Sequence, residues 1–306
     1  MSMFPSLFRG GLVAALLISA PALHAQIVAP AVSDIVLEVV SPSCTPMDIA
    51  YNPVQNLYYS VYGGGPSCPI ITHDGATGDE LLNTSSSSHD WRGVWWNADV
   101  GGPEGNPCSS CAREAIWAPE LDGAGFALAT GQITLTPTNQ PAFQSQGDLD
   151  TDMNEIIYYS SNQIFRVDRD TNANLPTLSL SGTPAGANLN SNLIGYSGIA
   201  DAEYMLWDFS NDRVLFYDRT GAYQGESAVA GAPPTSDSWN VGFANGRVFI
   251  WNGSGWNGYI VGPGTSAPAP PPAAAVPVPT LGLGLLVSLA LLLGWFGAAQ
   301  LRSRSA

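Results

Sequence analysis

The sequence predicts an all-β domain of short antiparallel strands, followed by one C-terminal transmembrane helix. Runs of β-branched and aromatic residues alternate with turns rich in Gly, Asn, Asp and Pro. The clearest runs are Leu57-Tyr58-Tyr59, Ile156-Ile157-Tyr158-Tyr159, Arg213-Val214-Leu215-Phe216-Tyr217 and Arg247-Val248-Phe249-Ile250-Trp251. No stretch between them keeps the apolar period of an amphipathic helix. The central part of the chain is therefore expected to be β-structure with little helix.

A weak internal repeat organises these strands. Met47 to Asn52 leads to Leu57 to Ser60, and one hundred residues later Gly147 to Asp152 leads to Ile157 to Ser160 in the same register. Each copy, and a third one, then reaches a turn that begins with an aspartate: Asp74, Asp168 and Asp218. The units start near residues 47, 91, 147, 198 and 240. This spacing of about 40–55 residues is the size of a four-stranded blade.

The pattern resembles a β-propeller, in which four-stranded blades surround a central axis. Five units imply five blades; six shorter blades and a β-sandwich are the alternatives. The last unit, Trp239 to Gly262, has room for three strands. We expect Ile35 to Val40 to supply the fourth strand and close the ring, because closure removes exposed sheet edges.

Both ends of the chain carry hydrophobic segments typical of export and membrane anchoring. Residues 1–25 have the layout of a secretory signal peptide, with Arg9, the apolar run Gly10 to Ala20 and a small residue before the expected cut. Residues 281–301 form an uncharged apolar run of 21 residues, long enough as a helix to cross a bilayer. Residues 26–262 are then the external domain, and the Pro- and Ala-rich residues 263–277 are a linker.

Residues 278–306 also resemble a known class of sorting signal. The motif, the apolar run and the arginines that follow it are similar to the IPTL-CTERM class of bacterial signals, which is related in layout to PEP-CTERM signals. The residues concerned are Val278, Pro279, Thr280, Leu281, Arg302 and Arg304. The resemblance implies display at the bacterial cell surface and an exosortase-type membrane protease as processing partner. An anchor that is never cut is the alternative.

The external domain is strongly acidic. All 25 acidic residues lie between Asp34 and Asp237, and the ten basic residues are all arginine. Arg9, Arg302 and Arg304 lie outside the domain, which leaves seven arginines against 25 acids and a formal charge of −18. Such a surface repels phosphates, so nucleic acid is excluded as a partner. The membrane is expected as a partner only through the C-terminal helix.

Four cysteines lie in the external domain, and an even number in an exported chain predicts two disulfides. We expect the pairs Cys44–Cys68 and Cys108–Cys111, because each closes a short loop. A redox role for the second pair is the alternative, since this spacing lowers the pKa of a thiol when a helix follows. No thioredoxin-like βαβ pattern surrounds it, so a structural pair is favoured.

An acidic run offers a candidate metal site. Asp148, Asp150 and Asp152 have the oxygen spacing that begins an EF-hand-type calcium loop. Met153 stands where that loop needs glycine, so an acidic turn between strands is the favoured interpretation. Calcium remains the one candidate cofactor, held there or by Asp48, Asp148 and Asp201 at the axis.

Aromatic residues are candidates for ligand binding, because their faces can stack on sugar rings. The expected surface patch comprises Trp91, Trp95, Trp96 and Trp256, with core packing as the alternative for most tryptophans. His73 and His89 each precede an aspartate, but neighbours on a strand point to opposite faces, so neither pair suits general-base catalysis. His73 is expected to be exposed.

The sequence favours binding over catalysis. It contains no Gly-x-Ser-x-Gly elbow, no HExxH motif and no phosphate-binding glycine loop, and the absence of lysine excludes Schiff-base chemistry. The expected function is an exported surface module that binds a glycan, a protein or a matrix component. A calcium-dependent hydrolase or lactonase of the propeller type, and a structural envelope or matrix component, are the alternatives.

Overall fold

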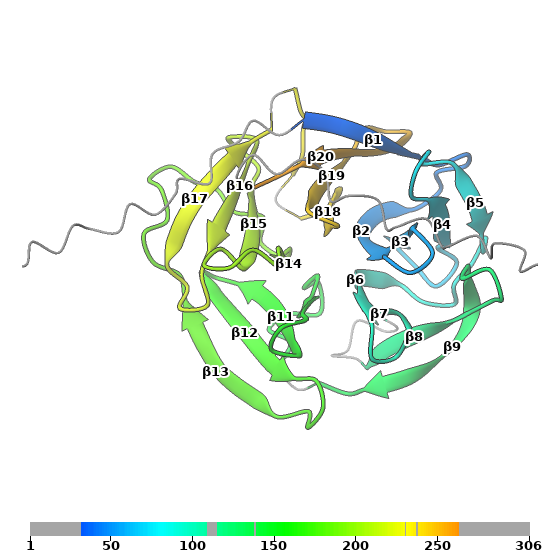
Figure 1. Cartoon of the computed structure of the whole chain (residues 1–306), viewed down its shortest axis with the longest axis horizontal. Helices are drawn as coiled ribbons and strands as arrows, with labels where there is room; N and C mark the ends of the chain where they lie inside the picture. The colour runs from blue at the N-terminus through cyan, green and yellow to red at the C-terminus, as the bar shows by residue number, and fades with distance from the viewer. Residues whose placement is uncertain (1–31, 109–114, 138, 230, 237, 263–306) are drawn as a thin grey trace, which may run out of the picture.

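The computed structural model describes residues 32–108, 115–137, 139–229, 231–236 and 238–262, which form five antiparallel sheets around a central axis (Figure 1). Each sheet has four strands. The first strands of neighbouring sheets contact one another around the axis, and the last strands lie on the outer rim. The described residues are therefore a five-bladed β-propeller, and the alternatives of six blades and a sandwich are wrong.

The five sheets are numbered here as blades. Blade 1 contains β2 (Thr45–Asn52), β3 (Leu57–Gly63), β4 (Ile70–Asp74) and β5 (Glu80–Asn83). Blade 2 contains β6 (Trp91–Asn97), β7 (Gly102–Pro107), β8 (Ile116–Leu121) and β9 (Ala127–Leu135). Blade 3 contains β10 (Asp148–Asp150), β11 (Glu155–Ser160), β12 (Gln163–Asp168) and β13 (Asn174–Ser179). Blade 4 contains β14 (Gly195–Tyr196), β15 (Tyr204–Asp208), β16 (Arg213–Tyr217) and β17 (Tyr223–Ala228). Blade 5 contains β18 (Val241–Ala244), β19 (Arg247–Trp251), β20 (Gly255–Ile260) and β1 (Val32–Glu38).

Strand β1 closes the ring, as the sequence predicts. It pairs antiparallel with β20 from Val32 opposite Ile260 to Glu38 opposite Gly255. The side chain of Leu37 is fully buried between blades 5 and 1. A second link joins β1 to blade 1, because the backbone N–H of Glu38 donates to the carbonyl of Gly78 at 2.9 Å. The N-terminal strand thus completes blade 5 and fastens it to its neighbour.

The hydrophobic core is divided into five clusters, one at each junction between neighbouring blades. Strand β3 shows why the middle strands are so aromatic. Its side chains alternate between the two faces, and every residue of the strand is buried. Tyr58 packs on Phe249 of blade 5 with ring centroids 5.2 Å apart, whereas Tyr59 stacks on Trp96 of blade 2 at 6.4 Å. A strand between two blades needs large apolar groups on both faces.

The aspartate turns join the third strand of a blade to the fourth. The carboxylate of Asp74 accepts backbone hydrogen bonds from Ala76 and Thr77, and Asp168 does the same with Asp170 and Thr171. Asp218 accepts from Thr220 and Ala222 in blade 4. Part of the acidic charge therefore serves the turns, because a carboxylate there satisfies backbone donors that the sheet leaves unpaired.

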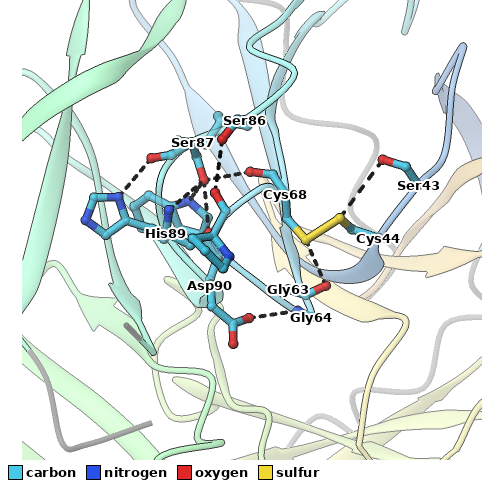
Figure 2. The surroundings of a disulfide bond; sticks show 12 residues. Ser43, Cys44, Gly63, Gly64, Cys68, Ser86, Ser87, His89 and Asp90 are labelled. Atoms are coloured by element: carbon cyan, nitrogen blue, oxygen red, sulfur yellow. Dashed lines mark hydrogen bonds between the residues drawn. A yellow bond between two sulfur atoms is a disulfide. The ribbon is translucent and has the colours of Figure 1, made fainter. Parts of the chain in front are cut away.

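The predicted disulfide Cys44–Cys68 is present (Figure 2). Cys44 directly precedes β2, and Cys68 lies in the loop between β3 and β4, 24 residues further on. The carbonyl of Cys68 also accepts hydrogen bonds from the backbone N–H and the hydroxyl of Ser87. Three connecting segments are thus fastened together beside the junction of blades 5 and 1.

Several predictions fall outside the described residues. These are the signal peptide 1–25, the linker 263–277, the sorting motif with its arginines, and the helix 281–301. Cys108 is disulfide-bonded, but its expected partner Cys111 is also outside, so that pairing stays a prediction. Within the described residues, no helix has the length and apolar character that a membrane crossing needs.

Candidate functional site

Of the three aspartates expected at the axis, Asp48 lies on the innermost strand β2 and Asp148 begins β10, whereas Asp201 lies in the turn between β14 and β15. The side chain of Asp48 is 3% exposed and accepts backbone hydrogen bonds from Ile49 at 2.8 Å and from Val94 of blade 2 at 3.0 Å. Burial raises the pKa of this carboxyl well above its usual value, and the charge of Asp148 raises it further. Asp48 therefore links the inner strands of two blades.

Asp148 plays the same part on the other side of the axis. It begins β10 and accepts backbone hydrogen bonds from Leu149 at 2.7 Å and from Tyr196 of blade 4 at 2.6 Å. Its side chain is partly exposed, but protein atoms replace most of the water around it. This loss of solvation raises the pKa of Asp148 to about 7. Such a carboxyl suits acid–base chemistry. Both of its oxygens are nevertheless engaged: one accepts from Leu149 within β10, and the other joins blade 3 to blade 4 through Tyr196.

Glycines allow the inner strands to approach the axis closely. A Cβ atom on Gly93 of β6 would lie 2.6 Å from the backbone N and O of Gly147, which precedes β10. A Cβ atom on Gly242 of β18 would lie 2.7 Å from the carboxylate of Asp48. The amide of Gln146 also donates across the axis to the carbonyl of Met47. Close backbone approaches and polar cross-links thus hold the inner strands together.

The pKa of Asp148 gives a pH dependence of known sign. In an unfolded chain an aspartate has a pKa of about 3.9. Between about pH 4 and pH 7 the folded domain keeps a proton that the unfolded chain has lost, so stability falls as the pH rises through this range. Melting temperatures are measured by circular dichroism for wild type and for Asp148→Asn. We expect the melting temperature of wild type minus that of the variant to decrease from pH 4.5 to pH 8.

Asp168→Asn is the matched control. Hydrogen bonds from Thr171 lower the pKa of Asp168, so its contribution is present above about pH 4 and is lost only below it. The difference between wild type and this variant should stay constant from pH 4.5 to pH 8. A constant difference for Asp148→Asn as well would contradict the raised pKa.

The three aspartates predicted as a calcium loop do not converge on one point. Asp148 lies at the axis, whereas Asp150 and Asp152 both bind the guanidinium of Arg219 from blade 4, at 2.9 and 3.2 Å. A cation is thus already supplied by the chain, between blades 3 and 4. No group of three or more His, Cys, Asp or Glu among the described residues is arranged to hold a metal ion. Calcium binding stays an untested prediction.

Arg219 follows a pattern that recurs in the preceding blade. Arg169 comes directly after the turn aspartate of blade 3 and reaches back to Glu104 of blade 2, a carboxylate with no exposed surface. Arg219 occupies the equivalent place after Asp218 and reaches back to Asp150, also fully buried. The arginine after the turn is therefore a repeated link between blades. This role explains the acidic run better than a metal site does.

The structure corrects the expectation of an exposed tryptophan patch. Trp91 and Trp256 have no exposed surface, and Trp95 is 2% exposed. The indole N–H of Trp91 donates to Ser87, and that of Trp256 donates to Tyr62. These three residues fill junctions between blades, because their strands are covered on both faces. Trp96 is half-buried against Tyr59.

His73 is also buried, contrary to the expectation that it would be exposed. Its Nε2 atom lies 2.8 Å from the hydroxyl of Ser60, and burial lowers its pKa to about 3. Neither side chain has exposed surface. A serine beside a histidine usually suggests nucleophilic catalysis, but here substrate cannot reach the pair. The contact instead joins β3 to β4 within blade 1.

A shallow groove at the junction of blades 3 and 4 was not found from the sequence. It has a volume of about 350 Å³. Its floor and walls come from β11, from the turn after it, from the segment after β15 and from the loop 180–194 that joins the two blades. The lining residues are Tyr159, Asn162, Thr183, Ala187, Asn188, Leu189, Ser191 and Phe209. None of them is charged, although the domain is strongly acidic.

The loop over this groove is held by a buried carboxylate. Asp208 at the end of β15 has no exposed side-chain surface and accepts from the backbone N–H of Asn188 at 3.0 Å. Arg213 neutralises it at 2.7 Å. The carbonyl of Asn188 in turn accepts from the N–H of Phe209.

One signal in the sequence could have indicated this uncharged groove: residues 171–200 contain no charged side chain.

No protein-family model matches the sequence, and the comparison with curated proteins gives no match. Among solved structures, the chain is similar to glutaminyl cyclase from Myxococcus xanthus, with a TM-score of 0.51 and 11% identity over 78% of this chain and 97% of that chain. It also matches streptogramin B lyase, with a TM-score of 0.36 and 12% identity over 74% and 72% of the two chains. At this identity the first likeness concerns the fold alone.

Proposed function

We propose that the chain is an exported surface protein whose propeller is a rigid binding module. The groove between blades 3 and 4 carries this conclusion, because its loop is held in place by Asp208, a residue of the domain itself. A preformed loop loses little conformational entropy on binding. Loops on a rigid β scaffold commonly carry the binding function of a protein.

Two features support export. The disulfide Cys44–Cys68 is of a kind that persists in oxidising compartments. The layout of residues 1–25 is that of a secretory signal peptide, and the apolar run 281–301 is long enough to anchor the chain. In this proposal the linker 263–277 separates the ring from the membrane, or presents the tail to a sorting protease.

Binding is favoured over catalysis by how the titratable side chains are used. Asp48 and Asp148 join inner strands, and His73 is enclosed within blade 1. The carboxylates beside Arg219 are engaged by that arginine. A hydrolase would need such groups to face a substrate.

Export is tested on intact cells that produce the full chain. We expect proteinase K to digest the domain on intact cells while a cytoplasmic protein stays protected, and mass spectrometry to find an N-terminus near Gln26. The variant Pro279→Ala alters the expected sorting motif and serves as the matched control for the tail. It should change the C-terminus that mass spectrometry finds and leave the N-terminal cut unchanged. A protected chain that still begins at Met1 would refute export.

Binding is tested separately with the purified domain 26–262, which contains every strand of the closed ring. Labelled domain is added to cells that lack the gene, and bound fluorescence is measured against concentration. We expect saturable binding that weakens in Phe209→Ala. Binding that is absent, or that never saturates, would count against a binding module without affecting the result on export.

A further inference from the structure

We infer that the groove between blades 3 and 4 binds a neutral oligosaccharide. This inference rests on the proposed binding function and names its ligand class. It depends on three observations: the charge of the groove, the side chains that line it, and the network that holds its loop in place.

The charge of the groove excludes two classes of ligand. An anionic ligand would be repelled by the acidic domain around it. A cationic ligand would need a carboxylate partner, and the lining residues include none. Asp208, which precedes the lining residue Phe209 in the chain, is fully buried and paired with Arg213. Two other hollows on the domain differ in this respect, because Glu120 lines one and Glu38 lines the other.

The lining side chains suit a ligand rich in hydroxyl groups. The lining includes the amides of Asn162 and Asn188, the hydroxyl of Thr183 and the half-buried Phe209, which also packs against the core between blades 4 and 5. The side chains of Asn162, Thr183 and Asn188 each make a hydrogen bond within the domain, to Leu180, Tyr217 and Ser210 respectively. A ligand that covers them must pair their remaining donors and acceptors, since an unpaired buried polar group costs about 1–3 kcal/mol. Sugar hydroxyls both donate and accept, and the apolar face of a sugar ring can lie on an aromatic ring. A purely apolar ligand can cover the aromatic ring but returns no hydrogen bonds to the polar groups.

The groove is also fixed in shape. The hydroxyl of Thr183 lies 3.0 Å from that of Tyr217, and the amide of Asn188 donates to Ser210 at 2.8 Å. The backbone N–H of Asn190 donates to the carbonyl of Trp207 at 2.8 Å. These contacts tie the loop 180–194 to blade 4 at several points. A volume of about 350 Å³ lies near the lower end of the range for small-ligand sites, which suits a short stretch of sugar units.

Calorimetric titration of the purified domain 26–262 tests the inference. The probes are three neutral hexasaccharides (of glucose in α-1,4 linkage, glucose in β-1,4 linkage, and N-acetylglucosamine), one anionic hexagalacturonate and one cationic hexamer of glucosamine. We expect a neutral probe to bind with an affinity that changes less than twofold between 0.05 and about 0.5 M NaCl, because no charge is screened. Phe209→Ala and Asn188→Ala should each weaken it at least tenfold.

Gln132→Ala is the matched control, since Gln132 is an exposed amide that lines the hollow containing Glu120 in blade 2. It should bind as wild type does. The use of two groove variants protects the test against a folding defect in either one. Failure of all neutral probes, equal binding of a charged probe, or unchanged binding in both groove variants would overturn the inference. Saturable binding to cells together with any of these results would leave the proposed function standing.

Discussion

A domain that begins at residue 39 is expected to lose its cooperative unfolding transition, whereas one that begins at residue 31 should keep it. The shorter form lacks β1 and with it the whole ladder to β20. It also loses the fully buried side chain of Leu37, and truncating such a residue alone typically costs about 2–5 kcal/mol. Domains of this kind are stable by about 5–15 kcal/mol, so loss of a complete strand can remove most of that margin.

The shorter form should also self-associate. Without β1, strand β20 becomes an open sheet edge, and such edges pair with other chains. Urea unfolding followed by circular dichroism, with light scattering after size exclusion, measures both effects. Equal urea midpoints and equal monomer sizes for the two forms would show that β1 does not close the ring.

Removal of the Cys44–Cys68 disulfide is expected to lower the free energy of unfolding by about 3–4 kcal/mol. The crosslink closes a loop across 24 residues, and the loss of this constraint enlarges the unfolded ensemble by about that amount. The double variant Cys44→Ala with Cys68→Ala isolates this bond, whereas a reductant would also reach the bond made by Cys108. Urea unfolding under oxidising conditions gives the value.

Ser43→Ala is the control for this variant, because Ser43 is the exposed neighbour of Cys44 in the same loop. It should change the unfolding free energy by less than about 0.5 kcal/mol. An equal urea midpoint for oxidised wild type and for the double alanine variant would contradict the expectation. The expected loss is large for this fold because the bond lies beside the junction where the ring closes.

Much of the ring could be read from the chain because its determinants are local. All five inner strands begin within three residues of the expected starts, and the aspartate turns stand where the repeat places them. Blade 4 begins with β14 at Gly195, a little before the start expected at Gly198. The segment around Asp201 is instead a turn that connects β14 to β15.

Strand β7 shows where local reasoning fails. Gly102–Pro107 contains two glycines and two prolines, a composition that indicates a loop. It is nevertheless fully buried as the second strand of blade 2. Glu104 within it accepts from Arg169 of blade 3 and from Asn97. The packing of a neighbouring blade therefore overrides the low strand propensity of these residues.

The candidate site was less readable than the fold. The tryptophans were proposed for a surface on the basis of polar neighbours in sequence. Trp91 and Trp95 lie on β6 and Trp256 on β20, however, and neighbouring blades cover all three. The groove between blades 3 and 4 depends on Asp208, which lies 20 residues beyond Asn188. Nothing near Asn188 in the sequence indicates that its loop is held.

The amino-acid sequence by itself determined the repeating unit, the strand that completes blade 5 and the first disulfide, because strand periodicity, turn chemistry and cysteine spacing act over short stretches of chain. The tertiary structure decided what the charged and polar side chains do. Asp150 meets Arg219 across 69 residues, and Glu104 meets Arg169 across 65. Whether a carboxylate binds a metal, an arginine or a backbone N–H depends on the blade that packs against it, and that neighbour is set only when the ring closes.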